Sequence, residues 1–159
     1  AEKVITIILP LAGIWGALIH SQLGCRDALN NTTSLVSCTL YGESERLMLS
    51  WLSGVILQLT LFAGLIIHFT LLVQYIPILA MIGGALFIPA MAISLGRISS
   101  TNRTFEFLFM LIWYAGPVDR IAALDFLGTT SEIGTPPIFG FLCVTAILMA
   151  TTVFTIKKR

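Results

Sequence analysis

The chain has 159 residues, of which 57% are hydrophobic and 11% are charged, and its net charge is +1. Soluble globular domains carry about 25% charged residues, so this composition excludes a soluble domain and predicts an integral membrane protein. The nine basic residues form no stripe, which argues against nucleic-acid binding. The three cysteines form no CxxC pair, so neither a disulfide framework nor a metal site is indicated.

Four stretches are apolar over the length of about 20 residues that a helix needs to cross a bilayer. They are residues 4–23, 47–73, 75–96 and 137–156. Pro77 lies in the first turn of the third stretch, where a missing N–H is tolerated, whereas Pro89 lies inside it and predicts a kink. We therefore predict an all-α polytopic membrane helix bundle that forms a single domain.

A fifth apolar stretch, residues 104–118, is shorter, and the distribution of basic residues decides how it is interpreted. If it does not cross, four basic residues lie inside and five outside, against the excess expected on cytoplasmic loops. If it crosses, seven lie inside and two outside. We therefore predict five spans. The fifth reaches only about 22 Å and is expected to break near Gly116 and Pro117.

Five spans place the N-terminus outside and the C-terminus in the cytoplasm. Residues 24–46 then form a cytoplasmic loop and residues 119–135 an outer loop. An odd number of spans with an outside N-terminus leads us to expect that an earlier span is missing and that the chain is a fragment. Small residues recur at helix-contact spacing, and we expect them to pack this bundle rather than a dimer interface. They are Ser50 and Gly54, Ala80 and Gly84, and Ala92 and Gly96.

The cytoplasmic loop, GCRDALNNTTSLVSCTLYGESER, begins with a basic–acidic pair and continues with a Thr- and Ser-rich stretch. Ser44 could cap the following span, next to two glutamates that suit a helix N-terminus. Arg26 could pair with Asp27 or with a partner protein. A solvated hairpin that merely connects two spans is the alternative.

From about Leu23 to Gly128, the sequence resembles the C-terminal part of a bacterial ABC-2-type permease, the membrane subunit of an ATP-binding-cassette transporter. The resemblance rests on GCRDALNNTTSLV, LSWLSGV and ALFIPAMAISLGRISSTNRTFEFLFMLIWYAGPVDRIAALDFLG in this order. It implies a six-span protomer with a short cytoplasmic helix between its second and third spans. That helix is expected to follow an Arg–acidic pair and a Thr-containing stretch and to dock on the ATPase. By this analogy the coupling position falls on Arg26, Asp27, Asn31 and Thr32, with Asp27 where Glu is commoner.

The chain contains no GxxxxGK[ST] sequence and therefore no P-loop. ATP and Mg²⁺ would bind a separate ATPase subunit, and this chain is expected to be no enzyme. The resemblance implies a second permease protomer, lipid as neighbour, a bacterial inner-membrane location and export of an amphipathic or lipid-like substrate. The alternative is a non-transporting membrane subunit that anchors or assembles a partner complex. The substrate, the transport direction and the choice between homodimer and heterodimer stay open.

Several polar residues at membrane depth or at the outer mouth are candidates for a translocation path or gate. They are His20, His68, Glu106, Asp119 and Arg120. The two histidines are expected at different depths, which argues against shared haem ligation. Glu106 could pair with Arg103 three residues earlier. The aromatic residues of the fifth stretch are expected to pack against helices or lipid rather than to form a substrate box; they are Phe105, Phe107, Phe109 and Trp113.

Overall fold

The computed structural model describes residues 7–32, 38, 42–119, 121–127 and 135–157, and this part of the chain is helical, without a strand. The helices are α1 (Leu9–His20), α2 (Arg26–Leu29), α4 (Glu43–Leu71), α5 (Tyr75–Ser99), α6 (Arg103–Trp113) and α7 (Thr135–Lys157). A π-helix, η2 (Tyr114–Val118), continues α6, and a 3₁₀ turn, η3 (Ala122–Leu124), follows it.

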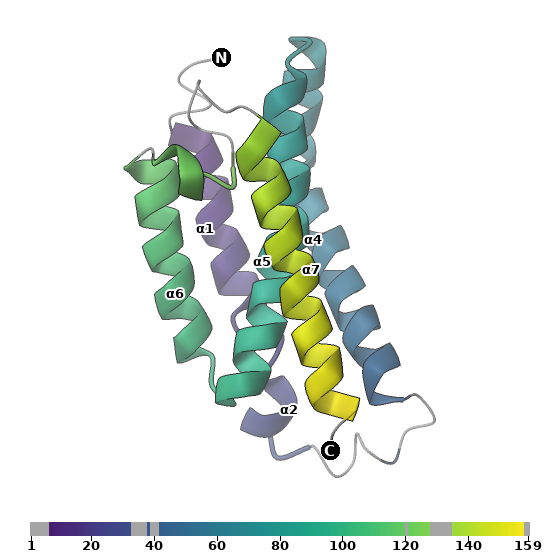
Figure 1. Ribbon diagram of the computed structural model, residues 1–159. Coiled ribbons are helices and arrows are strands. Elements are labelled where there is room, and N and C mark those ends of the chain that lie inside the picture. Colours follow the sequence, from purple (N-terminus) through teal and green to yellow (C-terminus); the bar gives the residue numbers. More distant parts are fainter. Residues whose placement is uncertain (1–6, 33–37, 39–41, 120, 128–134, 158–159) are drawn as a thin grey trace.

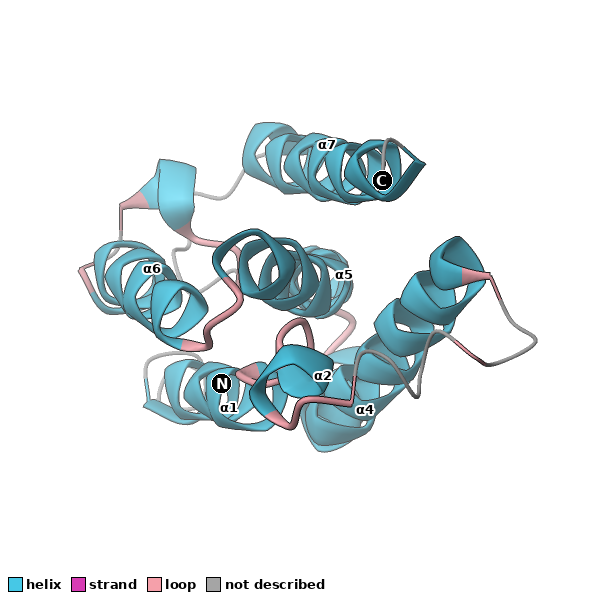
Figure 2. Cartoon of the chain, turned by 90° about the horizontal axis from the view of Figure 1, so that it is seen from below, coloured by secondary structure: helices cyan, strands magenta, loops and turns pink. Residues whose placement is uncertain are grey.

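The five longer helices run alternately down and up in Figure 1, beginning with α1. The lower end carries α2, the start of α4 and the connection from α5 to α6, and the upper end carries η2 and η3. Figure 2 shows α5 in the centre, with the other four helices around it. Accordingly, 72% of the most apolar window of α5 is buried, against 28% in α4 and 17% in α7.

Three helices in the described part of the chain are long and apolar enough to cross a membrane: α4, α5 and, within α7, residues 138–155. These three predicted spans are confirmed in length and composition. In contrast, α1 and α6 have 12 and 11 residues, or about 18 and 17 Å. They lie beside each other, since the Trp113 indole N–H donates to the Pro10 carbonyl at 2.8 Å. Five spans remain a prediction.

Several helix boundaries differ from those expected, and three of them concern a turn, a cap and a break. Residues 21–25 form turns, so α1 ends before the predicted 23. The helix α4 begins at Glu43, and its N-cap is Gly42 rather than Ser44. The Glu45 carboxylate accepts a hydrogen bond from the Gly42 N–H at 3.3 Å, as in half of a capping box. In the fifth stretch, the α-helix ends at Trp113 and the predicted break lies within η2.

Aromatic rings fill the core near the upper end. Phe126 contacts Phe87 of α5, Phe109 of α6 and Phe141 of α7, with ring centroids 6.0, 5.9 and 6.0 Å apart. Phe105 is also fully buried, whereas Phe107 is exposed. Phe105 and Phe109 therefore pack inside the bundle, as expected.

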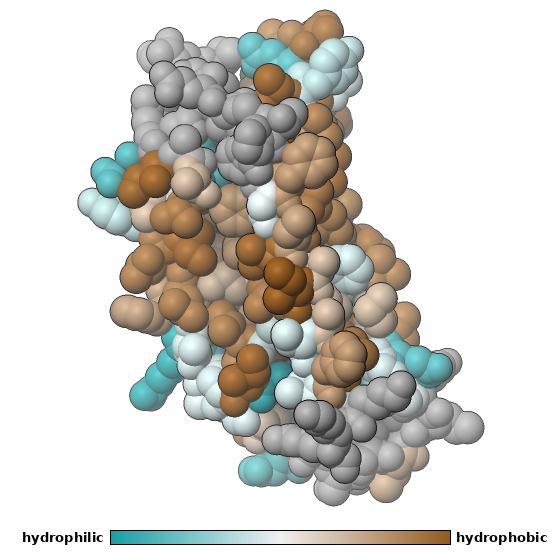
Figure 3. All heavy atoms as spheres, in the orientation of Figure 1, coloured by the Kyte–Doolittle hydropathy of each residue, from teal (hydrophilic) through white to brown (hydrophobic). Residues whose placement is uncertain are grey.

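Gly54, Gly84 and Gly96 face neighbouring helices or segments of the same bundle. A Cβ on Gly54 would lie 2.8 Å from Pro89, and one on Gly84 would lie 3.1 Å from the Phe126 carbonyl. These contacts confirm packing within this bundle for the three glycines. Hydrophobic side chains cover the middle of the face in Figure 3, and hydrophilic ones gather toward its two ends.

Candidate functional site

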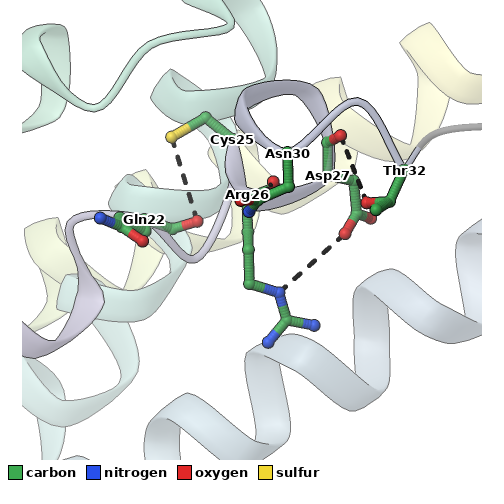
Figure 4. Close-up of polar contacts among 6 residues, drawn as sticks. All are labelled: Gln22, Cys25, Arg26, Asp27, Asn30 and Thr32. Carbon is green, nitrogen blue, oxygen red and sulfur yellow. Dashed lines mark hydrogen bonds and ion pairs between the residues drawn. The ribbon is translucent and has the colours of Figure 1, made fainter.

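The predicted coupling residues lie in and just after α2, at the lower end of the bundle (Figure 4). Arg26 and Asp27 form its first turn, and Asn31 and Thr32 end it. The Thr32 N–H donates to the Asp27 carbonyl at 3.0 Å, and the Asn31 N–H donates to the Ala28 carbonyl at 3.4 Å. This is a Schellman cap, and it requires the left-handed conformation of Asn31, whose φ is 52°. Asn31 and Thr32 therefore stabilise the helix end.

The two charged side chains of α2 face solvent. Arg26 Nε lies 4.0 Å from Asp27 Oδ1, and the side chains are 75% and 42% exposed. An ion pair of this kind contributes at most about 1 kcal/mol. The pair therefore leaves both charges available for a partner.

The position of α2 depends on a close backbone contact with α5. A Cβ on Gly24 would lie 2.5 Å from the Ile93 carbonyl oxygen, and one on Gly96 would lie 2.9 Å from the Gly24 Cα. Only glycine permits this approach. The turn that leads into α2 is thereby seated directly on α5.

Further polar contacts lie at the same end. Arg97 of α5 forms an ion pair with Glu43 of α4, in which Nη1 lies 3.1 Å from Oε1. Glu106 accepts a hydrogen bond from the Asn102 side chain at 2.8 Å. The expected pairing of Arg103 with Glu106 is not found, since no ion pair between them occurs in the described residues.

Burial raises the pKa of the Cys25 thiol, and the negative charge of Glu106 adds to the effect. Cys25 is therefore a poor nucleophile at neutral pH.

A second polar contact lies inside the bundle. His20 Nε2 of α1 lies 3.1 Å from Gln58 Oε1 of α4, and both side chains are almost fully buried. Gly16 makes room for the amide, because a Cβ there would lie 2.7 Å from Gln58 Oε1. Among the described residues, His20 Nδ1 and Gln58 Nε2 have no hydrogen-bond partner. The sequence-predicted candidate His20 thus belongs to a contact that joins α1 to α4.

The other candidates for a path or gate do not gather with His20. His68 lies near the end of α4 that adjoins α5, where its ring contacts Phe69 edge-on, and its Nε2 has no partner within the described part of the chain. Asp119 is exposed just after η2 at the upper end, and Glu106 lies at the start of α6 at the lower end. Arg120 lies outside the described residues.

Residues 119–135 were expected to form an outer loop, but the three residues that follow η3 are buried in the bundle. Asp125, Phe126 and Leu127 are at most 2% exposed. Asp125 Oδ1 accepts a hydrogen bond from the Leu127 N–H at 3.3 Å. Leu127 reaches Gly13 of α1, and Gly116 lets the segment approach because its missing Cβ would meet the Leu124 carbonyl. The segment packs back into the bundle because it carries two large apolar side chains.

Sequence reasoning missed four polar side chains that connect helices. Gln58 pairs with His20, Trp51 Nε1 donates to the Leu86 carbonyl at 3.2 Å, and Thr152 donates to Ser94 at 2.9 Å. The available signal was a lone Gln, Trp or Ser in an apolar helix, since such residues need a partner in a membrane.

No family model matches this chain, and no curated protein or solved structure is significantly similar to it.

Proposed function

We propose that this chain is part of the membrane-spanning permease subunit of an ATP-binding-cassette transporter of the ABC-2 type. It would lie in a bacterial inner membrane with a second permease protomer, and separate ATPase subunits would bind ATP and Mg²⁺. The observation that carries the proposal is α2, a short capped helix whose Arg26 and Asp27 are solvent-exposed at one end of the bundle.

The contacts around α2 suit the transmission of force into the bundle. The turn before α2 touches α5 through Gly24 and Gly96, and α1 is joined to α4 by the bond between His20 and Gln58. A displacement of α2 by an ATPase would therefore act on α1, α4 and α5 together. Rigid-body movement of packed helices is a common basis of two-state transitions.

The proposed topology has five spans, with α2 in the cytoplasm and Asp119 outside. The alternation of helix directions supports it, because the start of α1 and the end of α7 lie at opposite ends of the bundle (Figure 1). The basic residues Arg26, Arg97 and Arg103 belong to elements at the lower end, as the excess of positive charge on cytoplasmic loops requires.

The proposal is tested by searching the neighbouring coding sequences for a P-loop ATPase, expressing any such ATPase with the chain, and measuring ATP hydrolysis of the purified complex in lipid nanodiscs. Arg26→Ala together with Asp27→Ala should abolish the stimulation of ATPase activity by the membrane subunit. Arg103→Ala is the matched control, because Arg103 is exposed at the same end but outside α2. Equal activity of both variants, or failure of any ATPase to co-purify, would contradict the proposal and favour an anchoring subunit.

A further inference from the structure

A buried polar contact holds the end of α1 against α4. Figure 2 shows the two helices side by side, and His20 Nε2 lies 3.1 Å from Gln58 Oε1. The two side chains are 1% and 0% exposed. A Cβ on Gly16 would lie 2.7 Å from Gln58 Oε1, so the amide is pressed against the backbone of α1. The start of α1 is held separately, because the Trp113 indole N–H donates to the Pro10 carbonyl at 2.8 Å.

This contact supplies the hydrogen bond of a neutral histidine and not both bonds of a protonated one. A neutral imidazole has one N–H, whereas the protonated ring has two and accepts none. Gln58 offers a single acceptor atom, Oε1, because its Nε2 can only donate. In the described part of the chain, His20 Nδ1 has no hydrogen-bond partner. Protonation would therefore add a charge and an unsatisfied donor to a buried site, which is costly.

The carboxylates of the neighbouring helices do not compensate that charge. The helices that pack against α1 are α4, α5 and α6. Their charged or titratable side chains, with Cys25 in the turn after α1, are Glu43, Glu45, Arg46 and His68 of α4, Tyr75 and Arg97 of α5, and Arg103 and Glu106 of α6. Among the residues that the structure describes, none of these carboxylates forms an ion pair with His20. The contact is therefore complete only while His20 is neutral.

We propose that His20 and Gln58 form a proton-sensitive latch between α1 and α4. Neutral His20 donates its Nε2–H to Gln58 and keeps the end of α1 on α4, whereas protonated His20 releases it. The contact between Trp113 and Pro10 contains no group that titrates near neutral pH, so the start of α1 stays attached. The latch lets the end of α1 that leads into α2 move away from α4. This goes beyond the proposed function and can be measured without ATP or a partner subunit.

Thermal unfolding of the full chain in detergent, at about pH 5.5 and about pH 7.5, tests the titration. The chain has two histidines, and histidine is the side chain whose ordinary pKa of about 6.5 lies in this range. Because the closed latch excludes the second ring proton, the unfolded chain binds more protons than the folded one. Stability is therefore fully present above about pH 6.5 and declines below it. The unmodified chain should melt roughly 3–6 °C lower at the more acidic pH.

Two variants separate the latch from other titrating groups. His20→Gln keeps a hydrogen-bond donor toward Gln58 but cannot titrate, so its Tm should lose this dependence on pH. His68→Leu is the matched control, because it removes the other histidine and leaves the contact between α1 and α4 intact. The control should keep the full difference in Tm.

The distance between α1 and α4 tests the release itself. Leu18 of α1 and Leu57 of α4 are exposed, so spin labels on Leu18→Cys and Leu57→Cys report the separation of the two helices in nanodiscs once the chain's own cysteines are replaced. The mean distance should lengthen at about pH 5.5 and return at about pH 7.5, on either side of the ordinary histidine pKa. A control pair on Leu11→Cys and Leu111→Cys, both exposed beside the contact of α1 with α6, should not respond.

Gln58→Glu gives an independent test if His20→Gln does not fold. A carboxylate at this position would accept from the protonated ring and balance its charge, so the latch should stay closed at the acidic pH. A Tm of the unmodified chain that does not change with pH, an equal response of His20→Gln, or a longer distance in Gln58→Glu at acidic pH would overturn the proposal. Equal lengthening of both label pairs would also overturn it, because the whole bundle would then loosen.

Discussion

Replacement of Gly24 or Gly96 by alanine should destabilise the bundle, because the turn before α2 and helix α5 would have to separate. A Cβ on Gly24 would lie 2.5 Å from the Ile93 carbonyl oxygen, whereas ordinary contact begins near 3.4 Å. The difference, 3.4 minus 2.5, is a shift of 0.9 Å, and the atoms met are backbone, which cannot turn away. Overpacking of this kind costs about 1–3 kcal/mol.

The assay is the midpoint of thermal unfolding of the purified chain in detergent. For a chain of this size, about 1–3 kcal/mol corresponds to a fall of roughly 2–12 °C in Tm. Gly64→Ala and Gly140→Ala are matched controls, because a Cβ at either position meets nothing within 4 Å. Alanine favours a helix over glycine by about 1 kcal/mol, so these variants should be unchanged or slightly more stable. If Gly24→Ala and Gly96→Ala melt like the controls, the close approach of α5 to this turn is wrong.

Three other predictions concern polar groups. His20→Leu and Gln58→Leu should each lower the free energy of unfolding by about 1–3 kcal/mol, because a buried partner is left unsatisfied. In a double-mutant cycle of Tm measurements, the double variant should lose less stability than the sum of the two single variants. Additive losses would refute the contact. Because burial raises the pKa of the Cys25 thiol, a maleimide should modify Cys25 more slowly than the exposed Cys38, and equal labelling rates would contradict this. The folded state binds the thiol proton more tightly than the unfolded state, so folding stability should decline as pH rises above about 8.5. Arg97→Gln removes the partly exposed ion pair with Glu43 and should cost less than about 1 kcal/mol. A larger fall in Tm would contradict this estimate.

The long helices could be predicted from the sequence, because each contains a continuous apolar run, although their ends shifted by a few residues. Proline in the first turn marks the starts of α5 and α7, and the break of the fifth stretch follows from Gly116 and Pro117. The sequence did not predict α2 where it lies, because the resemblance placed a short helix after the Arg–acidic pair and the Thr-containing stretch, whereas α2 begins at Arg26. What it could not provide is the physical role of Asn31 and Thr32, which depends on hydrogen bonds to the carbonyls of α2.

The contacts between distant segments could not be predicted. Gln58 is a single polar residue in an apolar helix, and its partner His20 lies 38 residues earlier. The burial of Phe126 depends on rings from three helices, and its short segment has no periodicity that would indicate which side is buried. Neither pairing has a local signal, so both appear only when the helices are assembled.

The orientation of α2 is the central claim, and labelling of Cys38 tests it most directly. In a variant whose Cys25 and Cys143 are replaced by serine, Cys38 is the remaining thiol, and it is exposed. A sulfonated, membrane-impermeant maleimide should modify it in inverted membrane vesicles and not in intact cells. A cysteine-free chain carrying Asp119→Cys should give the opposite result. Modification of Cys38 in intact cells would put α2 outside, away from any cytoplasmic ATPase, and would contradict the account.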